Sequence, residues 1–492
     1  MKSESWILAI DQSTQGTKAI LTDAQGNIVG RCDKKHRQII SAQGWISHDP
    51  DEIFENVKAA AALVIEKTGI NKNSIKAIGI SNQRETTVMW HKDGTADQMA
   101  VVWQCDRAKE ITESLDFASE MVREKTGLPL SPFFPASKMA WLIQNTKAAD
   151  YFLGTMDTYL VYRMTEGKVF KTDYSNASRT QLFNLHTLKW DKDLCRLFGV
   201  PLAALPEVTD SNGDFGSTTL DGYFESPVPI CAVLGDSHGA LFAHGCHEKG
   251  MVKATYGTGS SIMMNTGSVY KKSRFGLASS LAWGIDGEVS YVLEGNINYT
   301  GAVVSWLEHD LSLIESPKAI ELLIKKANMQ DETVFVPAFS GLSAPYWDND
   351  ARAMVYGMSR TTGKAEFVKA ALESIAFQIT DVLRAMESDS GIKICHLQVD
   401  GGPTANAYLM QFQSDMAGVK VQVPDSEEFS ALGAAYMAGI KAGMYQKDQI
   451  FSDKPVTEYK PVMAEKERAE KLSRWKYALH LCMQHQSYQQ KK

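Results

Sequence analysis

A single carboxylate lies between two segments rich in glycine and hydroxyl side chains. The acid is Asp236, in the run Val-Leu-Gly-Asp-Ser-His-Gly-Ala at 233–240. The flanking segments are 11–18 (Asp-Gln-Ser-Thr-Gln-Gly-Thr-Lys) and 254–261 (Ala-Thr-Tyr-Gly-Thr-Gly-Ser-Ser). Turns of this kind beside a strand present N–H and O–H donors to phosphate oxygens, and a nearby carboxylate can take the proton of an attacking hydroxyl. The pattern predicts phosphoryl transfer to a hydroxyl group.

Length and composition exclude several classes of function. A chain of 492 residues is too long for one ordinary core, so we expect at least two domains. With 51 basic against 58 acidic side chains and a net charge of -7, no global positive field favours nucleic acid or a membrane as partner. The apolar run 6–10 is too short for a signal peptide or a membrane span. The sequence therefore predicts a soluble, cytoplasmic protein.

The seven cysteines are scattered and form no Cys-x-x-Cys pair. This spacing argues against a zinc site and against a disulfide framework. Reduced and mostly buried thiols are expected.

Short apolar runs alternate with stretches of helical period, which indicates an α/β protein. Strand 6–10 leads into a second strand and then a hairpin turn at 24–27. A Rossmann fingerprint requires its glycine-rich turn to enter a helix directly, so a dinucleotide site is disfavoured. Helices are expected at about 51–66, 107–124 and 137–146.

The strand and glycine-rich turn of the N-terminal segment recur near residue 230. A strand at 229–235 is followed by a glycine-rich turn with apolar flanks within 252–264, like an internal echo of the first segment. Polar residues 82–87 follow a strand at 76–81, where α/β proteins place ligands. A strand ending at Asp400-Gly-Gly leads into an amphipathic run at 407–416; these glycines suit either close approach to a ligand or a structural tight turn.

Several longer motifs resemble the FGGY carbohydrate kinases, and within that family they most resemble glycerol kinase. They cover nearly the whole chain in the same order. They are 82–87 (Asn-Gln-Arg-Glu-Thr-Thr), 102–107 (Val-Trp-Gln-Cys-Asp-Arg), 133–141 (Phe-Phe-Pro-Ala-Ser-Lys-Met-Ala-Trp), 172–180 (Thr-Asp-Tyr-Ser-Asn-Ala-Ser-Arg-Thr), 256–259 (Tyr-Gly-Thr-Gly), 336–348 (Val-Pro-Ala-Phe-Ser-Gly-Leu-Ser-Ala-Pro-Tyr-Trp-Asp), 353–358, 366–373 and 400–402.

The resemblance implies a two-lobed, actin-like and hexokinase-like α/β ATPase fold, in which each lobe has ribonuclease-H-like topology and a cleft lies between the lobes. It places an N-terminal lobe at 1–246, with the substrate pocket and catalytic base, and a C-terminal nucleotide-binding lobe at 247–492. The implied ligands are ATP, Mg²⁺ and a small polyol or sugar. A homo-oligomer, dimer or tetramer, stays open.

The resemblance also implies roles for individual residues. Asp236 matches the catalytic base; from the residues alone it also suits a helix N-cap, and both roles can hold together. Asp11 matches the acid that holds Mg²⁺, and contact through water is expected because that ion dehydrates reluctantly. Lys18 stands where glycerol kinases have arginine, and Ser305 where they have glutamine. The ATP-binding set is Thr14, Gln15, Lys18, Thr258, Gly301, Ser305, Gly402 and Asn406.

Arg84, Glu85 and Trp103 match the substrate pocket, with an Arg84–Glu85 ion pair as the structural alternative. Three other pocket positions depart from glycerol kinase: Phe133 replaces a tyrosine, Ser237 a glutamine and Ser261 a phenylalanine. The first change deletes a hydrogen bond and the other two shorten side chains. We therefore expect a substrate larger than glycerol or differently hydroxylated.

Three alternatives remain open. The first is an authentic glycerol kinase with a tolerant pocket. The second is a sensor that binds ATP and a sugar without turnover, which the intact Asp11, Thr14, Thr258 and Asp236 oppose. The third is a chaperone or filament protein with an actin-like fold, which the Arg84, Glu85 and Trp103 constellation opposes.

Overall fold

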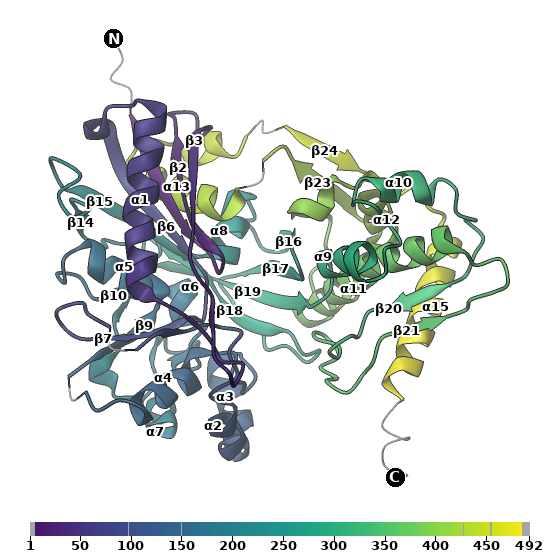
Figure 1. The fold of residues 1–492 in the computed structure, drawn as a ribbon, viewed down its shortest axis with the longest axis horizontal. Helices are drawn as coiled ribbons and strands as arrows, with labels where there is room; N and C mark the ends of the chain where they lie inside the picture. Colours follow the sequence, from purple (N-terminus) through teal and green to yellow (C-terminus); the bar gives the residue numbers. More distant parts are fainter. Residues whose placement is uncertain (1–4, 97, 149, 427, 453–454, 485–492) are drawn as a thin grey trace.

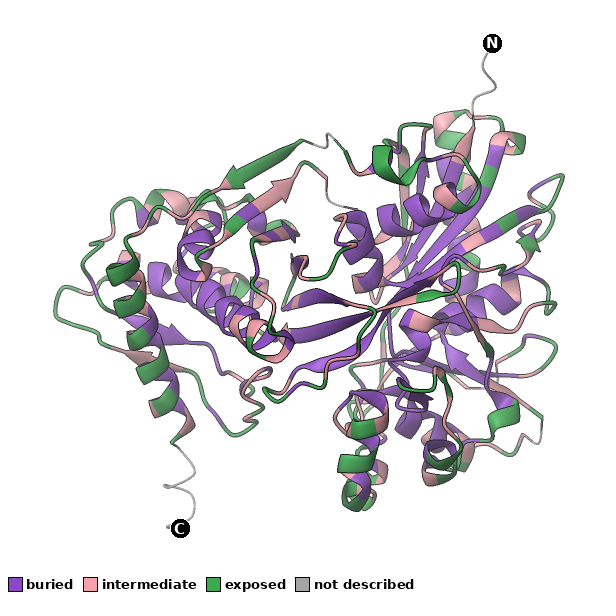
Figure 2. Ribbon diagram, turned by 180° about the vertical axis from the view of Figure 1, so that it is seen from behind, coloured by how far each residue is buried: buried purple, intermediate pink, exposed green. Residues whose placement is uncertain are grey.

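Two α/β lobes lie side by side, with strands β17 (Ser260–Gly267), β18 (Ala278–Ile285) and β19 (Glu288–Ile297) reaching from one toward the other (Figure 1). This computed structural model describes residues 5–96, 98–148, 150–426, 428–452 and 455–484. Both central sheets are buried along most of their length, and exposed residues gather on outer helix faces and connecting loops (Figure 2). The α/β class predicted from the sequence is confirmed.

The first lobe is built on a mixed six-stranded sheet in the order β14-β15-β6-β1-β2-β3. β1 pairs antiparallel with β2 and β2 with β3, which confirms the predicted hairpin turn at 24–27. β1 and β15 both run parallel to β6. The strands are β1 (Trp6–Gln12), β2 (Gly16–Thr22), β3 (Ile28–Lys35), β6 (Ile75–Asn82), β14 (Ser217–Thr218) and β15 (Val228–Gly235).

The second lobe repeats this arrangement in a seven-stranded sheet, β18-β19-β17-β16-β22-β23-β24. β16 pairs antiparallel with β17 and β17 with β19, while β16, β22 and β23 are parallel. The internal repeat expected from the sequence is thus confirmed. The strands are β16 (Val252–Tyr256), β17 (Ser260–Gly267), β18 (Ala278–Ile285), β19 (Glu288–Ile297), β22 (His396–Asp400), β23 (Lys420–Pro424) and β24 (Val456–Tyr459).

Alternate side chains of β1 point to opposite faces of the sheet and pack in two different hydrophobic cores. Leu8 and Ile10 pack with α1 (Pro50–Thr68), whereas Ile7 and Ala9 pack on the opposite face with α8 (Asp236–Ala243) and α13 (Phe429–Lys441). The sequence of α1 explains its bounds. Asp49 caps it by accepting the N–H groups of residues 51 and 52, and Gly69 ends it at a φ of 68°.

α8 and α13 cross at a pair of glycines. A Cβ built on Gly433 would lie 1.9 Å from the carbonyl oxygen of Gly239, and one on Gly239 would lie 2.8 Å from the carbonyl oxygen of Ser430. Only glycine permits two backbones to approach so closely. Because α13 comes late in the chain yet packs on β1, β6 and β15 of the first lobe, it ties the two lobes together.

A smaller sheet, in the order β4-β5-β8-β7-β9, lies beside the first lobe. It consists of β4 (Ile39–Ile40), β5 (Ile46–His48), β7 (Thr87–Trp90), β8 (Ala100–Val101) and β9 (Phe152–Thr155). The main helices of the second lobe are α11 (Lys364–Ser390), α12 (Ala407–Ala417) and α15 (Glu465–Met483), visible at the right of Figure 1.

One helix prediction needs correction. The single helix expected over 107–124 is broken into α2 (Lys109–Ser114), a 3-10 turn (Asp116–Ala118) and α3 (Ser119–Thr126). The last amide of the 3-10 turn bonds the Leu115 carbonyl at i−3 spacing, which interrupts the α-helical ladder. The helix expected over 137–146 is α4 (Pro135–Gln144).

All seven cysteines are free, and four of them are buried, as expected. No helix among the described residues is long and apolar enough to cross a membrane.

Candidate active site

The carboxyl ends of three parallel strands bring the predicted acids together. In the first sheet Asp11 of β1 pairs in register with Ser81 of β6, and Leu234 of β15 pairs with the same serine. Asp236 follows two residues after Leu234, at the start of α8. Because the ends of parallel neighbours lie at one edge of a sheet, the sequence order Asp11, Ser81, Asp236 becomes a spatial cluster.

Asp11 is a buried acid with a perturbed proton affinity. Its Oδ1 accepts a hydrogen bond from the Ser81 hydroxyl at 2.8 Å. Burial raises the pKa of Asp11 to about 6, against the opposing effect of the Lys18 ammonium 3.9 Å from Oδ2. One carboxylate near a phosphate-type turn suits Mg²⁺, which prefers one or two carboxylates together with phosphate oxygens and water.

The Lys18 ammonium is committed mainly to a different acid. It donates to Glu428 at 2.9 Å, and Arg31 forms an ion pair with the same carboxylate. Lys18 nevertheless lies beside Asp11, where it can also meet an anionic ligand.

Asp236 begins α8 rather than capping it. Gly235 is the N-cap, and Asp236 Oδ1 accepts the N–H of its neighbour Ser237 at 2.6 Å, so the N-cap reading of Asp236 is wrong. The side chain is 36% exposed, although the arginine that bonds it is buried. Arg84 Nε donates to the same Oδ1 at 3.1 Å. A Cβ on Gly235 would lie 2.7 Å from Arg84 Cγ, which explains the glycine before the acid.

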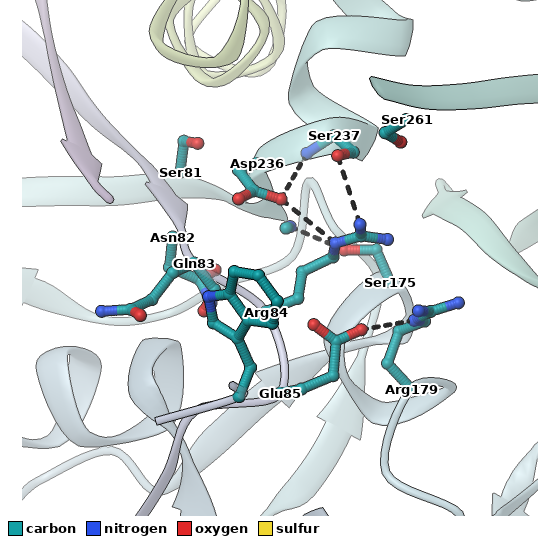
Figure 3. A network of polar contacts seen from close by, with 12 residues as sticks. Ser81, Asn82, Gln83, Arg84, Glu85, Ser175, Arg179, Asp236, Ser237 and Ser261 are labelled. Carbon is teal, nitrogen blue, oxygen red and sulfur yellow. Dashed lines mark hydrogen bonds and ion pairs between the residues drawn. The ribbon is translucent and has the colours of Figure 1, made fainter. Parts of the chain in front are cut away.

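Arg84 and Glu85 do not pair with each other, so the Arg84–Glu85 ion pair considered as a structural alternative is wrong. Arg84 Nη1 and Nη2 donate to the two oxygens of Glu294 at 2.9 and 2.8 Å, and Nη2 also donates to the Ser237 hydroxyl at 3.2 Å. Glu85 Oε1 instead accepts from Arg179 Nε at 2.6 Å. Figure 3 shows the two arginines side by side, with Asp236 and Ser237 above Arg84 and Glu85 beside Arg179.

The backbone at Glu85 helps to separate these two side chains. Its φ of 60° lies in the left-handed region, and the Thr86 N–H donates to the Arg84 carbonyl at 2.7 Å to close a tight turn. Non-glycine residues in this region cost on the order of 1–3 kcal/mol and cluster at ligand sites.

An aromatic wall adjoins the arginines. The rings of Trp103 and Phe133 meet edge to face with centroids 5.4 Å apart, and Phe133 meets Phe134 in the same way. Trp103 Nε1 donates to the Thr14 hydroxyl at 2.9 Å. This bond joins the predicted substrate wall to the predicted phosphate turn, so Trp103, Phe133 and Thr14 lie in one continuous site.

Ser261 reaches the same network from the second lobe. Its hydroxyl donates to Glu294 Oε1 at 3.2 Å. Ser237 and Ser261, two of the positions that depart from glycerol kinase, are thus both bonded to the Arg84–Glu294 pair rather than left as unfilled space.

Four of the eight predicted nucleotide residues, Gly301, Ser305, Gly402 and Asn406, line one cavity of about 500 Å³ in the second lobe. A Cβ at Gly402 would meet no atom within 4 Å, so this glycine keeps the cavity open rather than fitting tightly against protein. Asn406 caps α12 by accepting the Leu409 N–H at 2.9 Å. The residues that line the cavity are Gly301, Val304, Ser305, Pro317, Lys318, Ile320, Glu321, Leu372, Gly402, Pro403, Ala405 and Asn406.

The other four predicted ATP contacts, Thr14, Gln15, Lys18 and Thr258, lie outside this cavity. Thr258 occupies the β16–β17 turn, where its carbonyl accepts the N–H groups of Thr300 and Ala302 at 2.9 and 3.0 Å. Its turn thereby touches the segment that carries Gly301. Gln15 is exposed on the β1–β2 turn, and the structure brings it neither to the cavity nor to the arginine network described above.

Three polar residues of the site, Arg179, Lys253 and Glu294, were not predicted from the sequence, and they lie in the same cluster as His238, the polar residue expected beside the base. All are buried, and burial lowers the pKa values of His238 and Lys253. For Glu294 burial alone would raise the pKa, yet Arg179 and Arg84 hold it well below its usual range. The available signal was a charged residue inside an apolar strand, as in Tyr-Val-Leu-Glu-Gly at 291–295 and Met-Val-Lys-Ala at 251–254.

Comparison with known proteins decides the family. The N-terminal domain model of the FGGY family of carbohydrate kinases matches residues 6–243, and the C-terminal domain model matches residues 252–442. This chain belongs to the FGGY family of carbohydrate kinases. The predicted family, the two-lobed fold and the ATP-dependent kinase class are confirmed. FGGY kinases use ATP with Mg²⁺, which also confirms the predicted cofactors.

The similar proteins cover this FGGY kinase from end to end. Glycerol kinase of Carboxydothermus hydrogenoformans is 43% identical over 97% of this chain and 98% of its own length. Glycerol kinase of Desulfitobacterium hafniense is 41% identical over 98% of this chain and 100% of its own length. The crystal structure of Plasmodium falciparum glycerol kinase with ADP matches with a TM-score of 0.91 and 34% identity, covering 98% of each chain.

Proposed function

We propose that this FGGY kinase transfers the γ-phosphoryl group of ATP to a hydroxyl of a small polyol, with Asp236 as general base. The observation that carries this proposal is the bonding of Asp236. Within the described chain, both of its hydrogen bonds, from Arg84 and from the Ser237 N–H, fall on Oδ1. Oδ2 is left to accept a proton at a partly exposed position.

The proposed chemistry follows from this geometry. As the hydroxyl oxygen bonds to the γ-phosphorus, the hydroxyl proton passes to Asp236 and the bond from phosphorus to the leaving oxygen of ADP breaks. Arg84 fixes the carboxylate, and Glu85 and Trp103 supply a polar and an apolar contact for the acceptor. Asp11 is the residue proposed to hold Mg²⁺, which when bound would neutralise charge on the phosphates.

Gly301, Ser305, Gly402 and Asn406 are proposed to hold the nucleotide in the cavity that they line. Thr14, Gln15, Lys18 and Thr258 are proposed to hold its phosphates. The lobe boundary proposed at 246 and 247 lies between α8 and β16, between the segments matched by the two family models.

Glycerol is the first candidate for the acceptor. The similar proteins that cover the whole chain at 41–43% identity are named glycerol kinases. This evidence ranks glycerol above the larger substrate expected from the pocket residues alone.

A longer polyol of four or five carbons is the second candidate, favoured by Phe133, Ser237 and Ser261. Ser237 and Ser261 present hydroxyls bonded to Arg84 and Glu294, which can exchange partners with substrate hydroxyls.

The test is ADP release from purified protein with glycerol, four- and five-carbon polyols, and sugars, beside an Asp236→Asn variant. Loss of the base should lower kcat by about 10²–10⁴-fold while ADP binding persists. Undiminished turnover by this variant, or no acceptor that stimulates ADP release, would refute the proposal.

The double variant Ser237→Gln, Ser261→Phe separates the two acceptors. If the parent prefers a longer polyol, the added bulk should shift kcat/KM toward glycerol. If glycerol is already preferred, the acceptor ranking should stay the same.

A further inference from the structure

Glu294 is a buried carboxylate of the second lobe that contacts two arginines of the first lobe. It lies in β19 with a side chain that is 0% exposed. Arg84 donates to both of its oxygens, at 2.9 and 2.8 Å, and Arg179 Nη1 lies 2.8 Å from Oε2. A carboxylate removed from water is retained only when such partners replace its hydration.

The two arginines of this cluster are balanced by two buried glutamates, and a third carboxylate lies at its edge. Arg84 and Arg179 carry two positive charges, and the buried Glu85 and Glu294 carry two negative charges. Asp236, at the exposed rim, is a third carboxylate. Arg84 gives its Nη1 and Nη2 atoms to Glu294 and reaches Asp236 through Nε alone.

A guanidinium bonds a carboxylate best through two parallel N–H groups. If Glu294 did not occupy Nη1 and Nη2, the Nε and Nη2 edge of Arg84 would be free to take both oxygens of Asp236. Such a pair would stabilise the ionised form of Asp236 and weaken it as a proton acceptor.

We propose that Glu294 is a positioning residue that keeps Arg84 on a single oxygen of Asp236, so that the other oxygen stays available for the acceptor's proton. This inference rests on the proposed role of Asp236 as base. Glu294 also contacts Arg179, whose Nε bonds Glu85, so one carboxylate orients both arginines of the site.

Other charged groups also act on Asp236. Asp11 of β1 and Lys253 of β16 interact with it electrostatically, and Arg84 bonds it directly. His238 of α8 lies among the same arginines, and Glu294 acts on it as well. Replacement of Glu294 leaves these side chains in place, so a change in the pH profile reports the loss of the Glu294 charge together with the redistribution of Arg84 that follows from it.

The test is the pH dependence of kcat/KM for a Glu294→Gln variant, with the best acceptor found for the parent. We expect the plateau to fall by about 10²-fold or more, and the acid limb to move about one to three pH units lower, because Arg84 now pairs fully with Asp236. ADP affinity should stay at the parent value, since the nucleotide cavity lies elsewhere in the second lobe.

Two further variants make the result decisive. Glu294→Asp keeps the charge but shortens the side chain, so its acid limb and its rate should both lie between those of the parent and those of Glu294→Gln. Glu366→Gln, the same change at another buried glutamate that bonds the backbone N–H groups of Gly363 and Asn328, should leave the limb unmoved.

An unmoved acid limb in Glu294→Gln overturns the inference, whatever its rate. If that variant does not fold, Glu294→Asp alone decides: its shorter side chain weakens the grip on Arg84, and a profile identical to the parent's in both rate and limb overturns the inference. If Asp236→Asn keeps turnover, the proposed function itself fails. If Asp236→Asn is inactive while the Glu294 profiles match the parent, only the role of Glu294 fails.

Discussion

The crossing of α8 and α13 should set the position of Asp236, and a single methyl group tests this. In Gly433→Ala the new Cβ would start 1.9 Å from the Gly239 carbonyl oxygen, whereas real Cβ atoms stay at least 3.0 Å away. The two helices must therefore separate by about 1 Å, because both contacting atoms are tied to backbone. Asp236 lies three residues before Gly239 on the same helix and moves with it.

Overpacking of this kind costs about 1–3 kcal/mol of stability. A misplacement of about 1 Å at a reacting group can cost about 10²-fold in rate. We therefore expect Gly433→Ala to lower the melting temperature moderately and kcat by about 10²-fold.

Gly439→Ala is the matched control for this experiment. It is the same substitution in the same helix, but its Cβ would meet the Tyr445 ring at 2.2 Å rather than α8. It should lower thermal stability and leave kcat near the parent value at a temperature where both variants are folded. Equal losses of kcat in the two variants, or parental kcat in Gly433→Ala, would contradict the argument.

Two further predictions concern the nucleotide cavity and a buried acid. Gly402→Val places its side chain in the open cavity, so KM for ATP should rise about tenfold or more, about 1.4 kcal/mol, with unchanged thermal stability; an unchanged KM would remove Gly402 from the ATP site. Burial, with repulsion from Asp173, raises the pKa of Asp157 to about 7, so the folded state binds the extra proton and loses stability as pH rises from about 4 to 7. Asp157→Asn should abolish this dependence, so its stability relative to the parent should be greater at pH 8 than at pH 5 by up to about 3 kcal/mol in urea unfolding; identical pH dependence in both proteins would refute the assignment.

The elements that sequence reasoning found are those with local signals. The start of α1 follows from Asp49, Pro50 and the acidic first turn, and its end from Gly69. The hairpin at 24–27 follows from turn residues between alternating strands. The interruption between α2 and α3 has no comparable signal, because 107–124 contains neither glycine nor proline.

The site shows a similar division between local and long-range information. Polar residues after strand ends pointed to Asp11, Arg84 and Asp236, since position after a strand is a local property. The partners of Arg84 were not predictable in this way. Glu294 is 210 positions away along the chain, and only the packing of β19 against the first lobe brings it within hydrogen-bonding distance.

The repeated topology of the two lobes gives Asp236, the proposed base, a structural counterpart in Glu428, and comparing the two acids shows why only Asp236 suits that role. β15 leads into α8 in the first lobe as β23 leads into α13 in the second, and Glu428 immediately precedes α13 much as Asp236 begins α8. Both acids therefore follow equivalent strands. Glu428, however, is only 8% exposed and is paired through Oε2 with Lys18 at 2.9 Å and through Oε1 with Arg31.

With a cation on each oxygen, Glu428 has no oxygen left to accept a proton, which disqualifies it as a general base. Asp236 has its cation on one oxygen only, because the rest of Arg84 is taken by Glu294. The difference between the two equivalent positions thus lies in how their cations are shared, not in the acids themselves. That sharing is the property which substitution of Glu294 would remove.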